Sequence, residues 1–477
     1  MRRYIATVAV LLLLFTEIAS TMGISLEIIV STEIASTMAV PLEIIVSQRK
    51  SVRNYTDELI TSQQLLTLLH NAYGYSGDNR VLPRIGDAHS LVLYAINSSG
   101  TYIYTPETNS LSVWSSTVTK ETILPYLNQA WSWESNTDLF VFWDSTKMGN
   151  QYFASAEAGC LVQNFHLTAA SLGIGTCCLV GFNEDLRTEL GLPSTMVPLL
   201  MMSAGIPLPS YSYDPNATPA ISSMTDNLPV VQNSAKTFEE ALSDINFTET
   251  WVAEELSLQE QSQLLWAAYG YSSTGHRTTP SAEGWYPLIV YMLNATGTFR
   301  YLPEDHCVLE VQEGDKRSII ADIYGNQLWA ADAPTIFLLL YDSSFNTKYA
   351  EPGGFDYMVE IDAGCVVQQI LLESSALGLG ANVVSKGFEY WNGTSAQTLR
   401  NTLNIPSSIV PLHIIPVGHV IPTATPTPTP SSPPSSSPTP PEFLLILATL
   451  GIIAAVGFGI VILKRRSKNS NKFDKQQ

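Results

Sequence analysis

Two stretches of the chain decide its fold because they repeat each other. Residues 158–175 read AGCLVQNFHLTAASLGIG, and residues 363–380 read AGCVVQQILLESSALGLG. Both stretches predict a helix with matching positions on one stripe, namely Leu161, Phe165, Ala169 and Leu172 and then Val366, Ile370, Ser374 and Leu377. A helix this apolar must be covered on most sides. We expect each helix either in the core of its own repeat or at the seam between repeats.

The repeat extends outward over most of the chain. Residues 48–210 and 247–420 match weakly but in order, and 211–246 join them as a linker that becomes helix-like near 238–242. Shared segments are AYGYS (72–76, 268–272), NQ-x-W (128–131, 326–329) and VPL (197–199, 410–412). Strand-like runs at 90–96, 139–142, 287–293 and 335–341 show that each copy mixes helix and strand signals. Two copies in one chain suggest a fused dimer, in which sites between subunits become sites between halves.

The N-terminus has a secretory pattern. Arg2 and Arg3 precede an apolar run, and Ala19 with Ser20 offers a cleavage site, which predicts a signal peptide over 1–20. An uncleaved membrane anchor is the alternative. Residues 16–31 return as 32–47 with 13 of 16 positions identical. The segment 21–47 is therefore interpreted as a duplicated leader, to which no function is assigned.

The C-terminus predicts membrane attachment. Residues 443–463 carry no charge, and as a helix they would extend about 31 Å, close to the bilayer core of about 30 Å. The basic tail 464–477 follows and is expected in the cytoplasm. Residues 421–442 are a Pro/Ser/Thr stalk. We therefore expect a single-pass cell-membrane protein with its head outside; its sequons, which would make it a glycoprotein, begin at Asn54, Asn97, Asn216, Asn246, Asn294 and Asn392.

Composition excludes several classes of protein. The 477 residues have a net charge of −19, which argues against nucleic-acid binding. The seven histidines show no metal-ligand spacing, so no metal site is predicted; His166, on an apolar helix, is interpreted as a satisfied core histidine. Cys160 and Cys365 occupy equivalent positions. They could form a disulfide if the helices meet, or they could be two small buried apolar residues.

The opening of the first repeat carries a resemblance. Residues 49–55, RKSVRNY, resemble the R-x-S-x-R-x-[FY] opening of flavin-dependent nitroreductases. The run RTTPSA at 277–282, followed by YPL at 286–288, is similar to the SagB-type (azoline) dehydrogenase branch. The resemblance covers most of residues 48–420. It implies an α+β fold of two tandem nitroreductase-like α/β/α domains forming a pseudo-dimer, with FMN at the interface.

The same resemblance assigns roles to residues. Cofactor contacts are expected from Arg49, Ser51, Arg53, Val180, Gly181, Pro280, Ser281 and Ala282. The two arginines and Ser51 would hold the phosphate and ribityl chain, since guanidinium groups bind phosphate by paired, charge-assisted hydrogen bonds. The small-residue loop 280–282 would approach the ring. A backbone N–H at 180–181 would face flavin N5 and favour the reduced flavin.

The intact parts of the site are divided between the halves. The loop of the first half reads PRIG at 83–86, and the opening of the second half, TETWV at 248–252, has no arginine and carries Glu249. The sequence therefore predicts one FMN, unless both sites have decayed. We expect an extracellular flavin-dependent oxidoreductase acting on a small redox substrate, with no catalytic side chain and no need for a homodimer. The alternative is an inactive nitroreductase-fold module with a binding or structural role.

Overall fold

The computed structural model describes residues 40–86, 88–180, 183, 185–211, 213–214, 227–272, 274–344, 356–385 and 393–421. The predicted signal peptide, most of the leader, the stalk, the membrane segment at 443–463 and the basic tail lie outside these residues. Within the described ranges, no helix has the length and hydropathy needed to cross a membrane. The fold that follows is that of the head.

Each half contains one antiparallel sheet, and the two sheets have the same strand order. The first sheet runs β5–β4–β3–β6–β8–β7 and the second runs β11–β10–β9–β12–β15–β13, with β14 paired to β15. The strands of the first are β3 (Leu91–Asn97), β4 (Gly100–Thr105), β5 (Ser110–Ser115), β6 (Thr137–Asp144), β7 (Gly175–Leu179) and β8 (Met196–Gly205). Those of the second are β9 (Leu288–Leu293), β10 (Gly297–Leu302), β11 (Cys307–Glu313), β12 (Thr335–Asp342), β13 (Leu379–Ala381), β14 (Val384–Ser385) and β15 (Ile409–His419). The predicted tandem α+β halves are confirmed.

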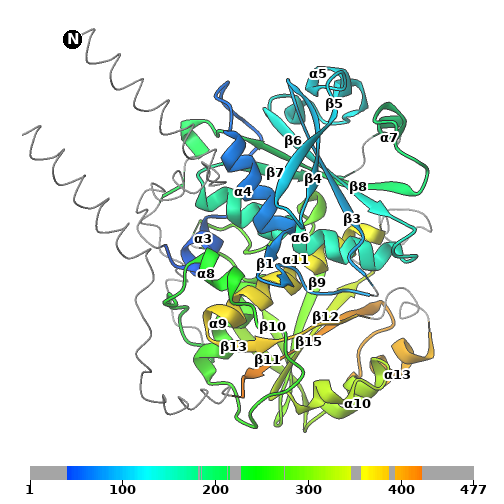
Figure 1. Ribbon diagram of the computed structural model, residues 1–477. Helices are drawn as coiled ribbons and strands as arrows, with labels where there is room; N and C mark the ends of the chain where they lie inside the picture. Colours follow the sequence, from blue (N-terminus) through cyan, green and yellow to red (C-terminus); the bar gives the residue numbers. More distant parts are fainter. Residues whose placement is uncertain are drawn as a thin grey trace, which may run out of the picture. The chain divides into compact units, whose positions relative to one another are not determined.

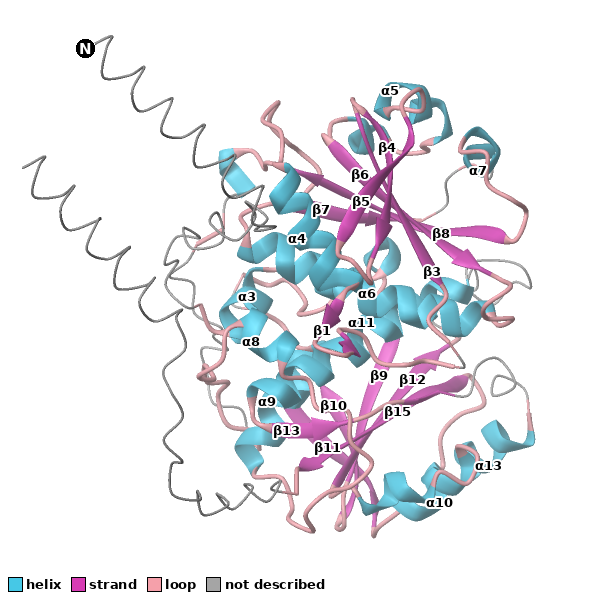
Figure 2. Cartoon of the chain, in the orientation of Figure 1, coloured by secondary structure: helices cyan, strands magenta, loops and turns pink. Residues whose placement is uncertain are grey.

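Helices lie between the two sheets and on their outer faces (Figures 1 and 2). The inner helices are α3 (Leu42–Gln48), α4 (Ser62–Tyr73), α6 (Gln151–Ser171), α8 (Phe238–Ser243), α9 (Leu258–Tyr269) and α11 (Asp356–Ala376). The outer helices are α5 (Lys120–Ile123) and α7 (Asp185–Glu189) on the first sheet, and α10 (Arg317–Ile323) and α13 (Thr394–Leu403) on the second. A short hairpin joins β1 (Tyr75–Ser76) to β2 (Asn79–Arg80). Each half thus has three layers, with its sheet between inner and outer helices.

Equivalent helices begin with the same device. Thr61 caps α4 by accepting a hydrogen bond from the Gln64 N–H at 3.1 Å, and the Gln64 side chain accepts one from the Thr61 N–H at 2.8 Å. Ser257 and Glu260 form the same reciprocal pair at the start of α9. Such capping boxes satisfy backbone donors that the helix itself leaves unpaired. They fix the start of the helix in both copies.

The seam between the halves is the contact of α6 with α11. Gly159 and Gly364 face each other, and a Cβ atom added to Gly159 would overlap the backbone oxygen of Ile361. The Cys160 thiol donates to the Gly364 carbonyl at 3.2 Å, and the Cys365 thiol donates to the Gly159 carbonyl at 3.2 Å. Both cysteines are free and buried. The helices are therefore seam and core at once, and the disulfide alternative does not hold.

The head includes described residues that precede the sequence-based boundary at residue 48. Helix α3 lies in the segment interpreted as leader, yet Leu42 and Val46 are fully buried in the core. In the linker, α8 buries Phe238 completely, which confirms the helix expected there. The end of the duplicated segment and the end of the linker are therefore structural parts of the head, because their apolar side chains complete the layer between the sheets.

Candidate functional site

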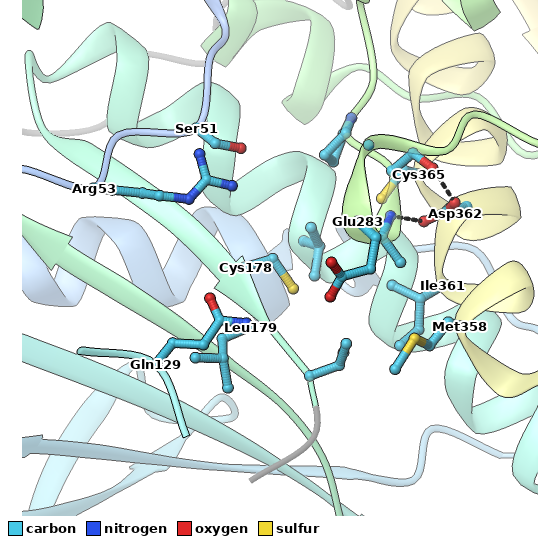
Figure 3. Close-up of a pocket in the computed structure, with 16 residues that line it drawn as sticks. Ser51, Arg53, Gln129, Cys178, Leu179, Glu283, Met358, Ile361, Asp362 and Cys365 are labelled. Carbon is cyan, nitrogen blue, oxygen red and sulfur yellow. Dashed lines mark hydrogen bonds between the residues drawn. The ribbon is translucent and has the colours of Figure 1, made fainter. Parts of the chain in front are cut away.

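The opening segment of the first half lies along the edge strand β7. The Val52 N–H donates to the Thr176 carbonyl at 2.9 Å, and the Tyr55 hydroxyl donates to the Val52 carbonyl at 2.6 Å. These bonds fix the backbone on both sides of Arg53. Ser51 and Arg53 consequently present their side chains to a cavity between the halves (Figure 3).

A loop from the second half forms the opposite wall of this cavity. The Ser281 hydroxyl donates to one oxygen of Asp362 at 2.5 Å, and the Ala282 N–H donates to the other at 2.9 Å (Figure 3). Ser281 in turn accepts a hydrogen bond from the Tyr286 N–H at 2.9 Å. Asp362 lies on α11 and is 3% exposed. Helix α11 thereby holds the loop in place through one carboxyl group.

The cavity, called site A below, has a volume of about 110 Å³ and is lined by residues of both halves. Six of the residues singled out in the sequence line it, namely Ser51, Arg53, Val180, Pro280, Ser281 and Ala282. Gly181 lies outside the described residues. Arg49 does not line the cavity. The structure thus brings together the opening of one half and the loop of the other.

Arg49 is buried at the junction of the halves, with 3% of its surface exposed. Its Nη2 and Nε atoms donate to the Arg277 carbonyl at 2.9 and 3.3 Å. Its Nη1 atom has no hydrogen-bond partner within the described part of the chain. Burial lowers the pKa of Arg49. A buried guanidinium with a donor to spare favours an anionic ligand beside it, because unpaired buried donors are costly.

Helix α11 supplies four further lining residues that sequence reasoning missed. Met358, Ile361, Asp362 and Cys365 all face site A. Their spacing is i, i+3, i+4 and i+7, which places them on one face of the helix. This spacing was visible in the sequence, but the stripe chosen there faces the core instead. Gln129, Cys178, Leu179 and Glu283 also line the cavity, and the repeated NQ-x-W segment was a signal for the first of them.

The chemistry of the buried groups in site A is set by desolvation. Burial raises the pKa of the Asp362 carboxyl to about 7. Burial also raises the pKa of the Cys178 and Cys365 thiols well above the usual range. These thiols are therefore protonated near neutral pH and are poor nucleophiles. The cavity can bind and orient a ligand, and its side chains include no activated thiolate.

His166 is buried, as expected, but it is not satisfied. Neither ring nitrogen has a hydrogen-bond partner among the described residues. Burial lowers the pKa of His166 well below its ordinary value, and the charges of Arg49 and Arg53 lower it further. The ring is therefore neutral. The interpretation of a satisfied core histidine is wrong in that respect, because the apolar helix brings the ring close to the charges of the buried Arg49 and the exposed Arg53.

Glu283 has an uncommon backbone conformation. Its φ is 53°, in the left-handed region that disfavours side chains. Figure 3 shows its carboxylate directed into site A. The position that corresponds in the first half, three residues after Pro83 as Glu283 is after Pro280, is Gly86, with φ of 81°. The fold requires a left-handed residue here, and only the second half places a charged side chain on it.

The pseudo-equivalent site between the halves differs in its donors. The Thr248 N–H donates to the Ala381 carbonyl at 3.3 Å, as the Val52 N–H does to Thr176. With Thr248 in the place of Val52, the residues in the places of Arg49, Ser51 and Arg53 are Ile245, Phe247 and Glu249. This second cavity, called site B below, thus lacks the Arg/Ser/Arg arrangement.

Comparison with known proteins places this architecture in a class. The sequence profile of the nitroreductase family matches residues 46–206 and 251–419. A protein of Methanocaldococcus jannaschii described as a nitroreductase is 32% identical over 173 residues, which is 35% of this chain and 82% of that protein. The chain therefore belongs to the nitroreductase family, and it contains the family domain twice.

One solved structure agrees with this chain in fold. A crystal structure described as a nitroreductase of Anabaena variabilis superposes with a TM-score of 0.62 at 16% identity, covering 81% of this chain and 93% of that one. Another, from Ralstonia eutropha, has 23% identity and a TM-score of 0.36, covering 43% of this chain and 94% of that one. The first likeness is longer than either half alone, so it supports the fold across both halves.

Proposed function

We propose that the protein is a flavin-dependent oxidoreductase that binds one FMN in site A, between its halves. One observation carries the proposal: Ser51 and Arg53 of the first half and the loop 280–282 of the second half line the same cavity. These segments are 227 or more residues apart in the chain. Packing alone does not require an arginine, a hydroxyl and a small-residue loop to meet there.

The donor set fits a phosphate-bearing flavin. Arg49 has a buried Nη1 atom without a partner among the described residues, and Arg53 adds a second guanidinium at the cavity. Two guanidinium groups can neutralise a phosphate dianion. The volume fits less well, because about 110 Å³ is below the range of roughly 300–1,000 Å³ usual for ligand pockets.

Each part of the chain then has a role toward the cofactor. Arg53 would hold the phosphate at the cavity wall, Arg49 would contribute its Nη1 atom, which has no partner among the described residues, and Ser51 would position the chain that carries the phosphate. The loop at Ser281, fixed by Asp362, would let backbone donors come close to the ring because its side chains are small. The backbone at Val180 and Gly181 would stabilise the reduced ring. When bound, FMN supplies two-electron transfer to a small-molecule substrate, so no side chain need act as a nucleophile. The small-residue loop favours the SagB-type branch.

The location proposed is the outer face of a cell membrane. The uncharged stretch 443–463 followed by the basic tail supports a single span with the head outside. The sequons differ in accessibility. Asn294 is 8% exposed and accepts hydrogen bonds from Thr296 and Gly297, so it is a poor acceptor for a glycan. The Asn54 amide donates to the Tyr211 hydroxyl at 3.1 Å.

The test is the visible spectrum of the full chain purified in detergent and incubated with FMN. The proposal predicts flavin absorption that remains after removal of free FMN. Arg53→Gln abolishes it, while Lys147→Gln, which removes an exposed cation that does not line site A, keeps it. A folded protein that stays colourless in the presence of FMN contradicts the proposal and supports the inactive binding or structural module.

A further inference from the structure

Site B is larger than site A. Its volume is about 1,030 Å³, compared with about 110 Å³ for site A. That volume is close to the upper limit of the roughly 300–1,000 Å³ typical of small-molecule pockets. The loss of the Arg/Ser/Arg arrangement has therefore not been accompanied by closure of the cleft.

The polarity of site B is reversed relative to site A. In site A the cation Arg53 comes from the opening segment and the acid Glu283 from the loop. In site B the acid Glu249 comes from the opening segment and the cation Arg84 from the loop. Phosphate is repelled by Glu249 at the place where site A attracts it. An anionic ligand must instead direct its charge toward the cations of the first half.

Those cations are arranged by the fold. Arg80 lines site B; its Nη1 atom donates to the Tyr73 carbonyl at 2.7 Å, and its Nη2 atom pairs with Glu107 at 3.2 Å. Its guanidinium lies over the Tyr73 and Tyr75 rings, 4.7 and 4.3 Å from their centroids. The Arg84 side chain is the exposed cation of the same wall. Asp78 also lines the cavity, so this wall carries charges of both signs. A ligand with a single carboxylate is therefore easier to accommodate there than a dianion.

Three aromatic side chains also line site B, among polar and aliphatic residues. Phe153, Phe247 and Trp329 line the cavity and are partly exposed. Trp329 is held by stacking on Trp251, with centroids 6.0 Å apart and planes 16° apart, and its indole N–H donates to Gln327 at 2.6 Å. Phe247 stands in the place of the hydroxyl-bearing Ser51 of the first half. Exposed aromatic faces in a cleft favour a planar aromatic ligand.

We propose that site B binds an aromatic carboxylate that carries no phosphate. The ring occupies the aromatic part of the cavity, and the carboxylate is held by Arg84. This site is independent of flavin binding in site A, because it uses different residues of both halves. It would give the fused chain two dissimilar sites where a symmetric pair would have two identical ones.

The test is calorimetric titration of the full chain in detergent with 2-naphthoate and with the neutral analogue 2-naphthalenemethanol. We expect one equivalent of 2-naphthoate, bound at least about tenfold more tightly than the alcohol, as a charge-assisted hydrogen bond implies. Arg84→Gln lowers the affinity by about tenfold, and Phe247→Ala lowers it independently. Arg53→Gln, in site A, leaves it unchanged.

Three results would overturn the proposal. Equal affinity for the acid and the alcohol would show that no cation contacts the carboxylate. An unchanged affinity in folded Arg84→Gln and Phe247→Ala places the ligand elsewhere. Displacement of 2-naphthoate by FMN in the Arg53→Gln variant shows that site B takes a flavin. None of these outcomes depends on whether site A binds FMN, so the two proposals fail separately.

Discussion

Arg49 of the first half donates two hydrogen bonds to the backbone carbonyl of Arg277 in the second half, from Nη2 at 2.9 Å and from Nε at 3.3 Å. Arg277 is itself fixed, because its Nη1 atom donates to the Tyr269 carbonyl at 2.9 Å and its guanidinium lies 4.0 Å from the centroid of the Tyr271 ring. The residue that joins the two halves is therefore also one of the two arginines that we propose to hold the phosphate.

This double role makes Arg49 separable from Arg53. Arg49→Met leaves the Arg277 carbonyl without its donor and is expected to lower the free energy of unfolding by about 1–3 kcal/mol. Arg53→Met alters an exposed side chain and should change it by less than about 0.5 kcal/mol. Urea unfolding followed by tryptophan fluorescence measures both. Equal destabilisation by the two substitutions would show that Arg49 does not join the halves.

The crossing of α6 and α11 should tolerate no added methyl group. Gly159→Ala places a Cβ against the backbone of Ile361 and Gly364, so we expect a loss of at least about 2 kcal/mol in the free energy of unfolding. The matched control is Gly149→Ala, where a Cβ meets nothing within 4 Å. Urea midpoints compare the two. If Gly159→Ala is as stable as the control, the helices do not make this close contact.

The left-handed turn of the site A loop predicts an opposite effect. Glu283→Gly removes a side chain from a residue with φ of 53° and should raise the free energy of unfolding by about 1 kcal/mol. Glu283→Gln keeps the backbone penalty and is the control for loss of charge. In the first half, Gly86→Ala is expected to destabilise, because φ is 81° there and the new Cβ would lie 2.8 Å from the Phe153 ring. Thermal or urea unfolding of the three variants measures these effects. If Glu283→Gly does not raise the free energy of unfolding, the prediction is contradicted.

The buried carboxyl of Asp362 makes stability depend on pH. Its pKa rises from the ordinary 3.8 to about 7 on burial, so between about pH 4 and pH 7 the unfolded carboxyl ionises while the folded one keeps its proton. The unfolded state then binds fewer protons, and stability falls as pH rises through this window, by roughly 4 kcal/mol at most. Asp362→Asn removes this contribution.

Urea unfolding at pH 4.5 and pH 7.5 measures the effect as a difference between wild type and Asp362→Asn. Burial also raises the pKa of Glu43 and Glu373, and their contribution has the same sign. It is present in both proteins and cancels in the comparison. An identical loss of stability between the two pH values in wild type and variant would show that Asp362 titrates normally.

The fold could be predicted from the sequence because most of its elements occur twice. Apolar helices and strand-like runs recur in both copies, and the linker helix has its own apolar pattern. Local periodicity of this kind predicts helices and strands without knowledge of the tertiary contacts. The start of the head could not be placed. Helix α3 arises from a segment that duplicates a leader-like sequence, and only the tertiary contacts of Leu42 and Val46 show that it belongs to the core.

The site was predictable only in its charged and small residues. Arg53 and Ser281 were identified through the resemblance of their segments to the nitroreductase family, and the affinity of arginine for phosphate and the close approach that small side chains allow agreed with that assignment. Met358 and Ile361 were not, because apolar residues on a wholly apolar helix cannot be divided between core and cavity without knowing how two helices cross. The role of Glu283 depends on its positive φ, which the pattern of residues does not reveal. The large volume of site B arises from the packing of two halves and has no local signal.

The central claim is that the two halves together complete one flavin site, and the stoichiometry of FMN tests it most directly. The full chain in detergent is saturated with FMN, freed of unbound ligand, denatured, and assayed for released FMN per chain. The account predicts one equivalent in wild type and in Glu249→Gln, and none in Arg53→Gln. Two equivalents in wild type, or one that Arg53→Gln retains, would contradict it.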